Sequence, residues 1–282
     1  MALVQPEIFA EAINDKLRVN LKVGSCAFDA TEYVGEIKQS GDTVHFPILN
    51  RIGDAAELTD NEELTPERVS MTDNSAKIKE IGKAVRVLDK EEIQAKGSVM
   101  DKIVEQLAEV MAKKIDADMA KAIDDEAVYK QAAAGADTVT KAELDATIAL
   151  FGDQIDSDTF ASWVINSRLV SSFMDMDAFV SASLTHTNEG NGIVKNGVIG
   201  YLYNVPVMVS NNGTYDDVKK ECKTYLIKKD ALGYVFQKDI LVEEERLPKL
   251  RATDIVTTSL YACKLIDAKG VAVLRKTIAG DM

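Results

Sequence analysis

The sequence predicts an α+β fold in which a long helix and the last strands form one body around a middle insertion. Three observations predict it: two extended segments near residues 43–49 and 75–88, a helical pattern over 99–127, and alternation over 253–265. The two extended segments are separated by a long acidic stretch instead of a tight turn, which is unusual inside a compact domain. Because a two-stranded ribbon is marginal alone in water, we expect this ribbon to pack on another copy of the chain. The sequence therefore predicts a protein that assembles.

Composition narrows the possible functions. Of the 282 residues, 46% are hydrophobic, an ordinary fraction for a folded protein. The net charge of −13 argues against specific nucleic-acid binding, which normally needs a basic surface. No apolar run approaches the length of a membrane span, and the first residues do not resemble a signal peptide. Three widely spaced cysteines, Cys26, Cys222 and Cys263, suit buried thiols in a reducing compartment, and zinc-site spacing is absent.

The first element is expected to be an amphipathic helix from Pro6 to about Leu21. Proline suits the first turn of a helix, and Gly24 ends the pattern. The apolar positions recur at helical spacing: Ile8, Phe9, Ala12, Ile13 and Leu17. A single helix ahead of an extended region is typical of an arm that lies on another molecule, so its apolar stripe is a candidate assembly contact.

The ribbon follows this arm. Its first strand places Val44, Phe46 and Ile48 on one face, and Pro47 marks it as an edge or exposed strand because proline cannot donate to a ladder. In the return strand the apolar parity switches beside Gly82. Such a switch predicts a bulge and a bend there.

The clearest helix runs from Val99 to about Ala127 without Gly or Pro. Ser98 and Asp101 form a plausible capping box at its start. Its apolar face consists of Ile103, Leu107, either Val110 or Met111, Ile115, Met119 and the pair Ala122-Ile123. At 1.5 Å per residue the helix is a rod of roughly 40 Å, longer than the average globular helix, which predicts a spine for a wide domain.

The middle and the end of the chain predict shorter elements. An alanine-rich break at 132–136 is a candidate boundary, and Thr140 with Glu143 caps a helix that ends at Leu150. The remaining predicted elements are a strand at 163–165, a helix at 169–179, two strands over 197–209 that turn at Asn204, and strands at 225–227, 234–236, 240–242, 253–265 and 271–274. Along the last long strand the apolar Val256, Leu260 and Ala262 oppose Thr257, Ser259 and Tyr261, which suits a half-exposed sheet on the back of the long helix.

No catalytic, cofactor or metal site is predicted, so an enzyme is not expected. Asp153, Asp156 and Asp158 lack the glycine and the terminal glutamate of an EF-hand loop. Asp175 and Asp177 alternate and do not face each other for general acid–base chemistry. The two histidines, His45 and His186, lie far apart with no nucleophile elbow nearby, and Trp163 is most simply a core residue.

Several segments resemble the major capsid proteins of tailed bacteriophages. Residues 41–47 and 82–91 resemble the two sides of their extended loop, and the helix from Ser98 resembles their spine helix. The stretch 196–207 resembles a Gly-x-Leu-x-Gly-x-Pro-Val turn, with Asn204 where glycine is common. The closing segments 229–232, 243–246 and 255–257 are similar as well. No single motif is specific, but their order and spacing over essentially the whole chain are.

The resemblance implies the tailed-phage major capsid protein fold with four parts. These are an N-terminal arm (1–35), an extended loop (36–90), a peripheral domain (91–131 and 239–282) and an axial domain (132–238). It also implies pentamers and hexamers that tile an icosahedral shell, the virion capsid, around double-stranded DNA that is contacted only non-specifically. A scaffolding protein and a portal are the implied partners, without any membrane, and assembly is expected in the host cytoplasm.

The candidate assembly-interface residues are Phe9, Ile13, Phe46, Arg51, Glu57, Glu62, Glu63, Arg68 and Arg246. The acidic stretch 54–67 is expected to dock on a basic patch of a neighbouring copy, where charges supply register more than strength. Some family members join subunits through a lysine in this loop, but no lysine occurs from Arg51 to Ala76. We therefore expect no such cross-link. Without a long N-terminal extension, a separate scaffolding protein is expected.

Two other classes remain open from the sequence. A bacterial nanocompartment shell would share this fold but enclose enzymes and lack portal and scaffold partners. A soluble enzyme is the third alternative, although the chain offers no constellation of polar residues for one.

Overall fold

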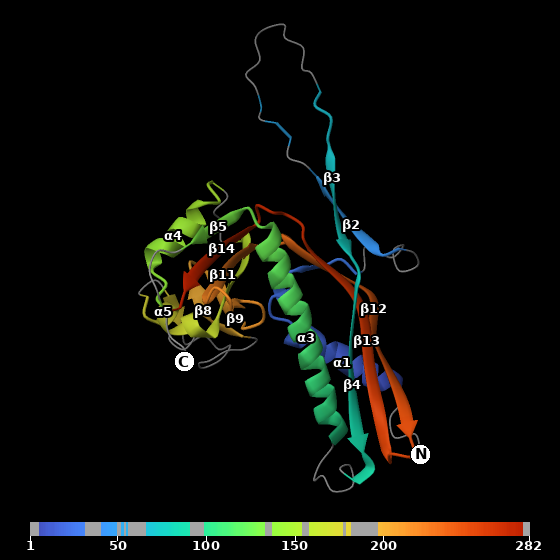
Figure 1. Cartoon of the computed structure of the whole chain (residues 1–282). Helices are drawn as coiled ribbons and strands as arrows, with labels where there is room; N and C mark the ends of the chain where they lie inside the picture. Colours follow the sequence, from blue (N-terminus) through green and yellow to red (C-terminus); the bar gives the residue numbers. More distant parts are fainter. Residues whose placement is uncertain are drawn as a thin grey trace.

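The computed structural model describes residues 6–31, 41–49, 52–53, 55, 66–90, 99–132, 137–153, 158–176, 179–181 and 197–278. Two sheet-bearing halves lie on either side of one long helix, and a two-stranded ribbon projects away from both (Figure 1). We call the half with the four-stranded sheet the long-sheet half, and the other the middle half. The mixed helix and sheet content matches the predicted α+β class.

The helices are α1 (Pro6–Asn20), η1 (Gly24–Cys26), α3 (Val99–Glu126), α4 (Lys141–Ala149), η3 (Ser167–Leu169) and α5 (Val170–Met174). The first strands are β1 (Phe28–Asp29), β2 (Thr43–Leu49), β3 (Met71–Lys77), β4 (Lys79–Leu88), β5 (Tyr129–Ala132), β6 (Phe160–Ile165) and β7 (Phe179–Ser181). The later strands are β8 (Val198–Leu202), β9 (Val205–Val209), β10 (Tyr215–Asp216), β11 (Glu221–Lys228), β12 (Leu232–Leu247), β13 (Ala252–Leu265) and β14 (Val271–Thr277).

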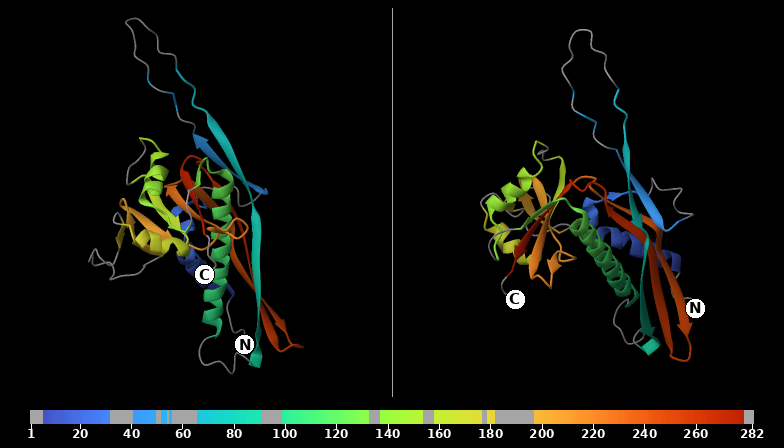
Figure 2. Two further views of the ribbon diagram at one scale, coloured as in Figure 1. Left: turned by 60° about the vertical axis from the view of Figure 1, so that its left-hand side comes forward. Right: turned by 45° about the horizontal axis from the view of Figure 1, so that its top comes forward.

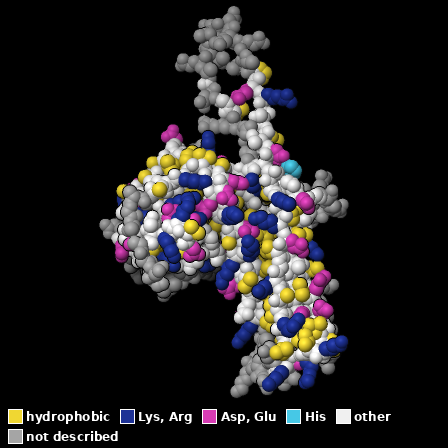
Figure 3. Space-filling view, in the orientation of Figure 1, with side chains coloured by type: hydrophobic (Ala, Val, Ile, Leu, Met, Phe, Trp, Pro, Cys, Tyr) yellow, Lys and Arg dark blue, Asp and Glu magenta, His cyan; other side chains and the backbone are white. Residues whose placement is uncertain are grey.

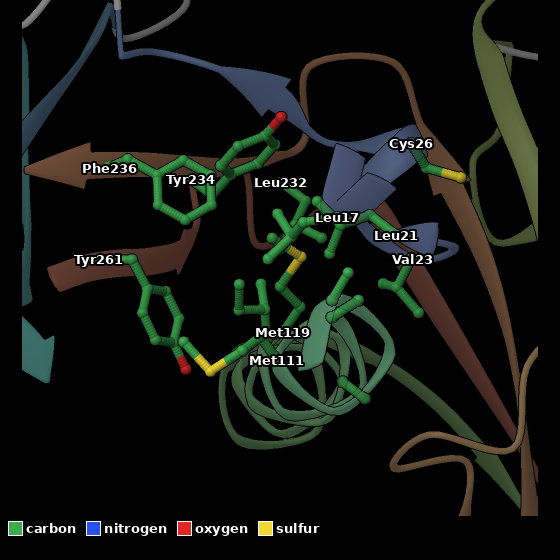
Figure 4. Packing of buried hydrophobic residues seen from close by; sticks show 14 of the residues in the cluster. Leu17, Leu21, Val23, Cys26, Met111, Met119, Leu232, Tyr234, Phe236 and Tyr261 are labelled. Carbon is green, nitrogen blue, oxygen red and sulfur yellow. The ribbon is translucent and has the colours of Figure 1, made fainter. Parts of the chain in front are cut away.

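The long-sheet half is a sheet of order β1-β12-β13-β4 with α1 and α3 packed on one face. Figure 4 shows how the core forms: Leu17 of α1 and Met111 and Met119 of α3 lie close to Leu232 and Tyr261 of the sheet. The 28 residues of α3 agree with the predicted spine helix. Its apolar face is buried, and it includes Met111 instead of Val110, which is 46% exposed. The expectation that the last strands pack on this helix is confirmed.

The first helix departs from the prediction. α1 packs on α3 and β12 of its own chain, where Phe9 and Ile13 are buried in the core. The apolar stripe of α1 is buried, but it is buried against α3 and β12 of its own chain and not against another copy. The assignment of Phe9 and Ile13 to a contact between copies is therefore corrected to a core role.

The ribbon forms as predicted, with β2 antiparallel to β3 from Thr43 opposite Lys77 to Leu49 opposite Met71. The bulge predicted at Gly82 is wrong. The break lies at Ile78, whose N–H donates to the Asp42 carbonyl (2.8 Å), and β4 then pairs with β13 without a register shift. Gly82 serves a close approach instead, because a Cβ there would lie 3.1 Å from the Thr257 carbonyl oxygen.

The base of the ribbon is anchored on its own chain. Val44, Phe46 and Ala76 are buried against Val235 and Ala262 on the outer face of the long sheet, the face opposite α3. This corrects the assignment of Phe46 to an interface between copies. A ribbon with this apolar base does not need a neighbour to hold its first residues.

The two faces of β13 are buried the opposite way to the one that the alternation suggested. Thr257, Ser259 and Tyr261 of β13 are buried toward the helices, whereas Val256 and Leu260 are half-buried on the outer face. The buried hydroxyls are satisfied: Thr257 Oγ1 donates to the Lys83 carbonyl (2.9 Å) and Ser259 Oγ to the Lys238 carbonyl (3.0 Å). Polar residues can therefore face this core while apolar ones remain outside.

The middle half contains a mixed sheet of order β5-β14-β11-β6-β9-β8-β7, with β10 beside β11. The predicted capping box of Thr140 and Glu143 is present at the start of α4, and Trp163 of β6 is fully buried in a second core. The predicted helix at 169–179 is shorter, and β7 follows it. Tyr203 and Asn204 have φ values of 53° and 64° and connect β8 to β9 as a two-residue hairpin turn.

Sheet membership differs from the expected boundaries. β14 pairs with β11 and β5, so residues 271–277 lie in the middle half and not in the peripheral part. β12 begins at Leu232 and lies in the long sheet, as does β4. These differences arise because the chain crosses between the halves near residues 128, 230 and 268, which composition does not mark.

Candidate assembly site

Beyond its anchored base, the ribbon extends away from both halves (Figures 1 and 2). The described residues 66–73 are all exposed, as are 52–53 and 55. Three large apolar side chains lie among them: Ile52 is 61% exposed, Val69 56% and Met71 69%. Polar contacts run within the ribbon itself, between the Gly53 N–H and Glu67 (2.8 Å) and between His45 and Asp73 (2.7 Å). The described outer residues of the ribbon thus offer an exposed and partly apolar surface.

The part of the long sheet's outer face that the base of the ribbon leaves free is the second surface not covered by described residues. Apolar side chains that are exposed or half-buried there are Ala84, Leu88, Leu241, Leu247, Val256 and Leu260. Figure 3 views the molecule from this side and shows hydrophobic side chains gathered over the lower part of the sheet. Contiguous exposed apolar surface of this kind marks an interaction site.

Two ion pairs hold the far end of this sheet together. Arg246 makes a two-pronged contact with the carboxylate of Asp89 (2.5 and 2.6 Å), which holds the pKa of Asp89 below its usual range. Arg86 does the same with Asp254 (2.7 and 2.8 Å). Arg246, a predicted interface residue, is therefore engaged within its own chain, where it joins the end of β12 to the end of β4.

Beyond these pairs the far end of the sheet presents an exposed basic group, which we call the basic end: Lys90, Lys249 and Arg251. Figure 3 shows Lys and Arg side chains at this lower end of the molecule. The sequence analysis did not single out these residues. The signal that could have found them is the Pro-Lys-Leu-Arg stretch at 248–251, which interrupts two strand patterns and is therefore a hairpin tip.

The other candidate residues have mixed outcomes. Arg68 is exposed on the ribbon. Arg51, Glu57, Glu62 and Glu63 lie outside the described residues, as do Asp156, Asp177 and His186. The structure therefore brings none of the predicted interface residues together into one patch among those it describes.

Buried carboxylates on α3 connect it to both halves. Asp118 accepts hydrogen bonds from Tyr261 (2.6 Å) and Lys114 (2.9 Å), and Lys79 lies 3.3 Å away. Although burial acts to raise the pKa of Asp118, these donors hold it below the usual range. Burial has the larger effect at Asp116 and raises its pKa. The spine helix is thus held by ionic as well as apolar contacts.

Acid should destabilise the chain through Asp118 and Glu143. Burial acts to raise the pKa of Glu143, but the Thr140 N–H and the buried Lys276 lower it overall. Groups with a depressed pKa contribute stability above their unfolded pKa, about 4, which is lost as pH falls through the folded value. We expect the free energy of unfolding to fall below about pH 5. Among the described carboxylates with a shifted pKa, Asp116 opposes this fall, because its pKa is raised.

Urea titrations from pH 7 to pH 3 measure this effect. Glu143→Gln should lower stability at pH 7, because it leaves Lys276 buried without its partner, and should flatten the acid dependence. Glu105→Gln removes only an exposed pair with Lys16 and should cost under about 1 kcal/mol. An acid profile unchanged in Glu143→Gln would contradict this assignment.

Other features of the described residues give no sign of a chemical site. Burial raises the pKa of all three thiols, to about 11 for Cys222 and for Cys263. A shallow groove between α1 and α3 is lined mainly by charges of both signs, including Asp15, Lys16 and Glu109. Within the described ranges, no three His, Cys, Asp or Glu side chains come together as metal ligands.

The helices that the structure describes were also compared with membrane spans. None of them combines the length and the apolar character needed to cross a bilayer.

The sequence and the fold of this chain were compared with those of known proteins. A family model described as phage capsid protein matches residues 72–274. The major capsid protein of Staphylococcus phage phiMR11 is 24% identical over 264 residues, which cover 93% of this chain and 89% of that protein. The solved capsid of cyanophage P-SCSP1u has a TM-score of 0.61 at 14% identity and covers 90% of this chain and 88% of its own. The mature capsid of bacteriophage PhiM1 has a TM-score of 0.58 at 12% identity and covers 93% and 86%.

Proposed function

Since this chain belongs to the phage capsid protein family and is a structural major capsid protein of a phage, we propose that its copies assemble as pentamers and hexamers into an icosahedral head around double-stranded DNA. The observation that carries this proposal is the projecting ribbon, whose described outer residues are exposed and apolar in part. Such a ribbon has no stabilising core of its own. It gains one when it lies on a neighbouring copy.

The neighbour's surface that fits the ribbon best is the outer face of the long sheet. Val69 and Met71 can bury apolar area against Val256 and Leu260, and each Å² removed from water contributes about 25 cal/mol. A standard interface buries about 800 Å² per partner. A ribbon and a sheet face of this size can supply contact on that scale, repeated around each ring of subunits.

Charge complementarity supports one orientation of this contact. The acidic stretch 54–67 carries Glu57, Glu62 and Glu63, and the basic end presents Lys249 and Arg251. Opposite charges on the two surfaces would fix the register of the ribbon and speed encounter, while apolar area supplies most of the affinity. Arg68 flanks the stretch and adds a positive charge near its end.

A charge swap tests this orientation. Lys249→Glu with Arg251→Glu should reduce shell yield at least tenfold, because the acidic stretch then meets like charges. Adding Glu62→Lys and Glu63→Lys to the same chain should restore assembly. Shell yield is measured by gradient sedimentation and electron microscopy, with thermal unfolding as the check on folding.

The matched control changes the same charge elsewhere. Lys219→Glu with Lys229→Glu alters two exposed lysines away from the basic end, one in the middle half and one at the crossing after β11. It should leave the shell yield near that of the unchanged chain. An equal loss of shell yield in this control would overturn the proposed orientation. So would a variant with all four substitutions that does not recover the shell yield.

The remaining partners follow from the family. We propose that a scaffolding protein and a portal assist assembly in the host cytoplasm, and that the shell contacts DNA only non-specifically, as the acidic net charge favours. Because no lysine occurs from Arg51 to Ala76, shells should lack a covalent cross-link through the ribbon. The capsid protein family match favours a phage head over the nanocompartment shell that the sequence left open.

A further inference from the structure

Within the described ranges, the polypeptide crosses between the two halves three times, and these three crossings meet at one corner. They lie at 127–128, 229–231 and 266–270, beyond the C-terminal end of α3. Backbone hydrogen bonds join them: Val128 N–H to the Ala268 carbonyl (2.9 Å), Ile266 N–H to the Ala231 carbonyl (2.8 Å) and Lys228 N–H to the Gly270 carbonyl (2.9 Å). Three adjacent crossings at a single corner can act as a pivot between the halves.

A second attachment between the two halves lies at Asp116, ten residues before the C-terminal end of α3. The residues after α1, Lys22 to Cys26, form a short segment that we call the strap. The carboxylate of Asp116 is fully buried, and its Oδ2 and Oδ1 accept the backbone N–H groups of Lys22 (3.0 Å) and Gly24 (3.1 Å). A buried carboxylate is costly unless it is hydrogen-bonded, so the strap and Asp116 stabilise each other.

The strap is bound to the middle half as well. Lys22 Nζ donates to the Val209 carbonyl (3.0 Å), and the Cys26 thiol lies 2.8 Å from Ser162 Oγ. Asn212, in the loop after β9, also directs its side-chain amide toward Asp116 Oδ2 (3.4 Å). One carboxylate on the spine helix therefore contacts both the strap and a loop of the middle half.

The same loop is seated directly on the helix. Gly213 has a φ of +73°, and a Cβ there would lie 2.6 Å from the Ala120 Cβ and 3.2 Å from the Ala117 Cα. Only glycine allows this approach at that conformation. We call the set of Asp116, the strap, Asn212 and Gly213 the bracket.

Between the corner and the bracket, α3 also contacts the middle half through buried apolar residues of its strands and through the ion pair of Asp124 with Lys223. Apolar packing is non-directional, whereas the hydrogen bonds of the bracket hold the two halves in one relative orientation. Asp116 and Glu126, at the end of α3, are ten residues apart along the helix, which separates the bracket from the corner by about 15 Å. We propose that the bracket fixes the angle between the long-sheet half and the middle half, with Asp116 as its positioning residue. In an assembled shell this angle would set the curvature, a consequence that rests on the proposed function.

Spin-label distances in the unassembled chain test the angle directly. Labels at Val218→Cys, where the wild-type side chain is 93% exposed, and at Lys249→Cys report on the two halves, in a Cys263→Ala background. The otherwise unchanged chain should give one narrow distance distribution. Asp116→Ala should broaden the distribution, because the halves then pivot about the corner.

The matched control is Asp118→Asn, two residues along the same helix. Its partners Tyr261, Lys114 and Lys79 lie in the long-sheet half or on α3 itself, so this variant should lose stability and keep a narrow distribution. If Asp116→Ala does not fold, Asn212→Ala removes the contact from the other side and should also broaden the distribution. A narrow distribution in a folded variant of Asp116 or Asn212 would overturn the proposal.

Shell dimensions test the consequence for curvature. Shells assembled from the Asp116→Ala chain should vary in diameter or fail to close, whereas a loss of stability alone would reduce yield at constant diameter. Uniform shells of the wild-type diameter would overturn the link to curvature. Failure of the wild-type chain to assemble would instead refute the proposed function, without affecting the spin-label result.

Discussion

Replacement of residues 50–70 by an Asn-Gly turn should abolish shell assembly and leave the fold intact. Leu49 lies opposite Met71 in the ribbon, so a two-residue turn can close the hairpin at that pair. The anchor of the ribbon is retained, because Val44, Phe46 and Ala76 keep their contacts with the long sheet. What is removed is the segment beyond Leu49 and Met71, which includes the exposed Ile52 and Val69 and which we propose lies on a neighbour.

The measurement combines electron microscopy of the assembly products with thermal unfolding of the soluble chain. The shortened chain should unfold at the temperature of the unchanged chain and form no shells at any concentration. In a second variant, a Gly/Ser linker of equal length replaces residues 50–70, which keeps the length of the segment but removes its side chains. This variant should also form no shells. Closed shells from the shortened chain would contradict the role of the ribbon.

Truncation of Trp163 should have the largest effect on stability. Trp163 is fully buried in the second core, and Trp→Ala substitutions at such sites cost about 3–5 kcal/mol. Its indole N–H has no hydrogen-bond partner among the residues that the structure describes, so Trp163→Phe loses volume but no hydrogen bond seen there. We expect this milder variant to cost clearly less than Trp163→Ala.

Urea unfolding followed by far-UV circular dichroism measures both variants, because fluorescence is lost with the single tryptophan. Leu150→Ala, at the partly exposed end of α4, serves as a control and should cost under about 1 kcal/mol. Equal costs for Trp163→Phe and Trp163→Ala would contradict the role assigned to side-chain volume in this core.

Local patterns predicted much of the fold. The 3.6-residue period identified α3, the two-residue period identified β2, and the capping pair of Thr140 and Glu143 identified α4. These elements are specified by residues near one another in sequence. Segment-level chemistry therefore sufficed to predict them.

Partners distant in sequence were harder to predict. The stripe of Phe9 and Ile13 showed that α1 needed burial, but not that the same chain supplies it. The polar face of β13 became a core face because Asp118 lies opposite Tyr261. Side-chain hydrogen bonds of this kind depend on residues more than a hundred positions apart, and a hydrophobic pattern does not encode them.

The candidate site was predicted only in outline. The ribbon and its acidic stretch are visible in the sequence, whereas the basic end arises from Lys90, Lys249 and Arg251. These residues meet only after β4, β12 and β13 align in one sheet. Arg246 looked equally available in sequence but is paired with Asp89 in the fold.

A cryo-electron microscopy map of the assembled shell tests the central claim most directly. We predict that the ribbon of each copy lies on the outer face of the neighbour's long sheet, with its acidic stretch at the neighbour's Lys249 and Arg251. A map in which the ribbon folds back on its own chain, or in which that sheet face is uncovered in the closed shell, would contradict the proposed mode of assembly.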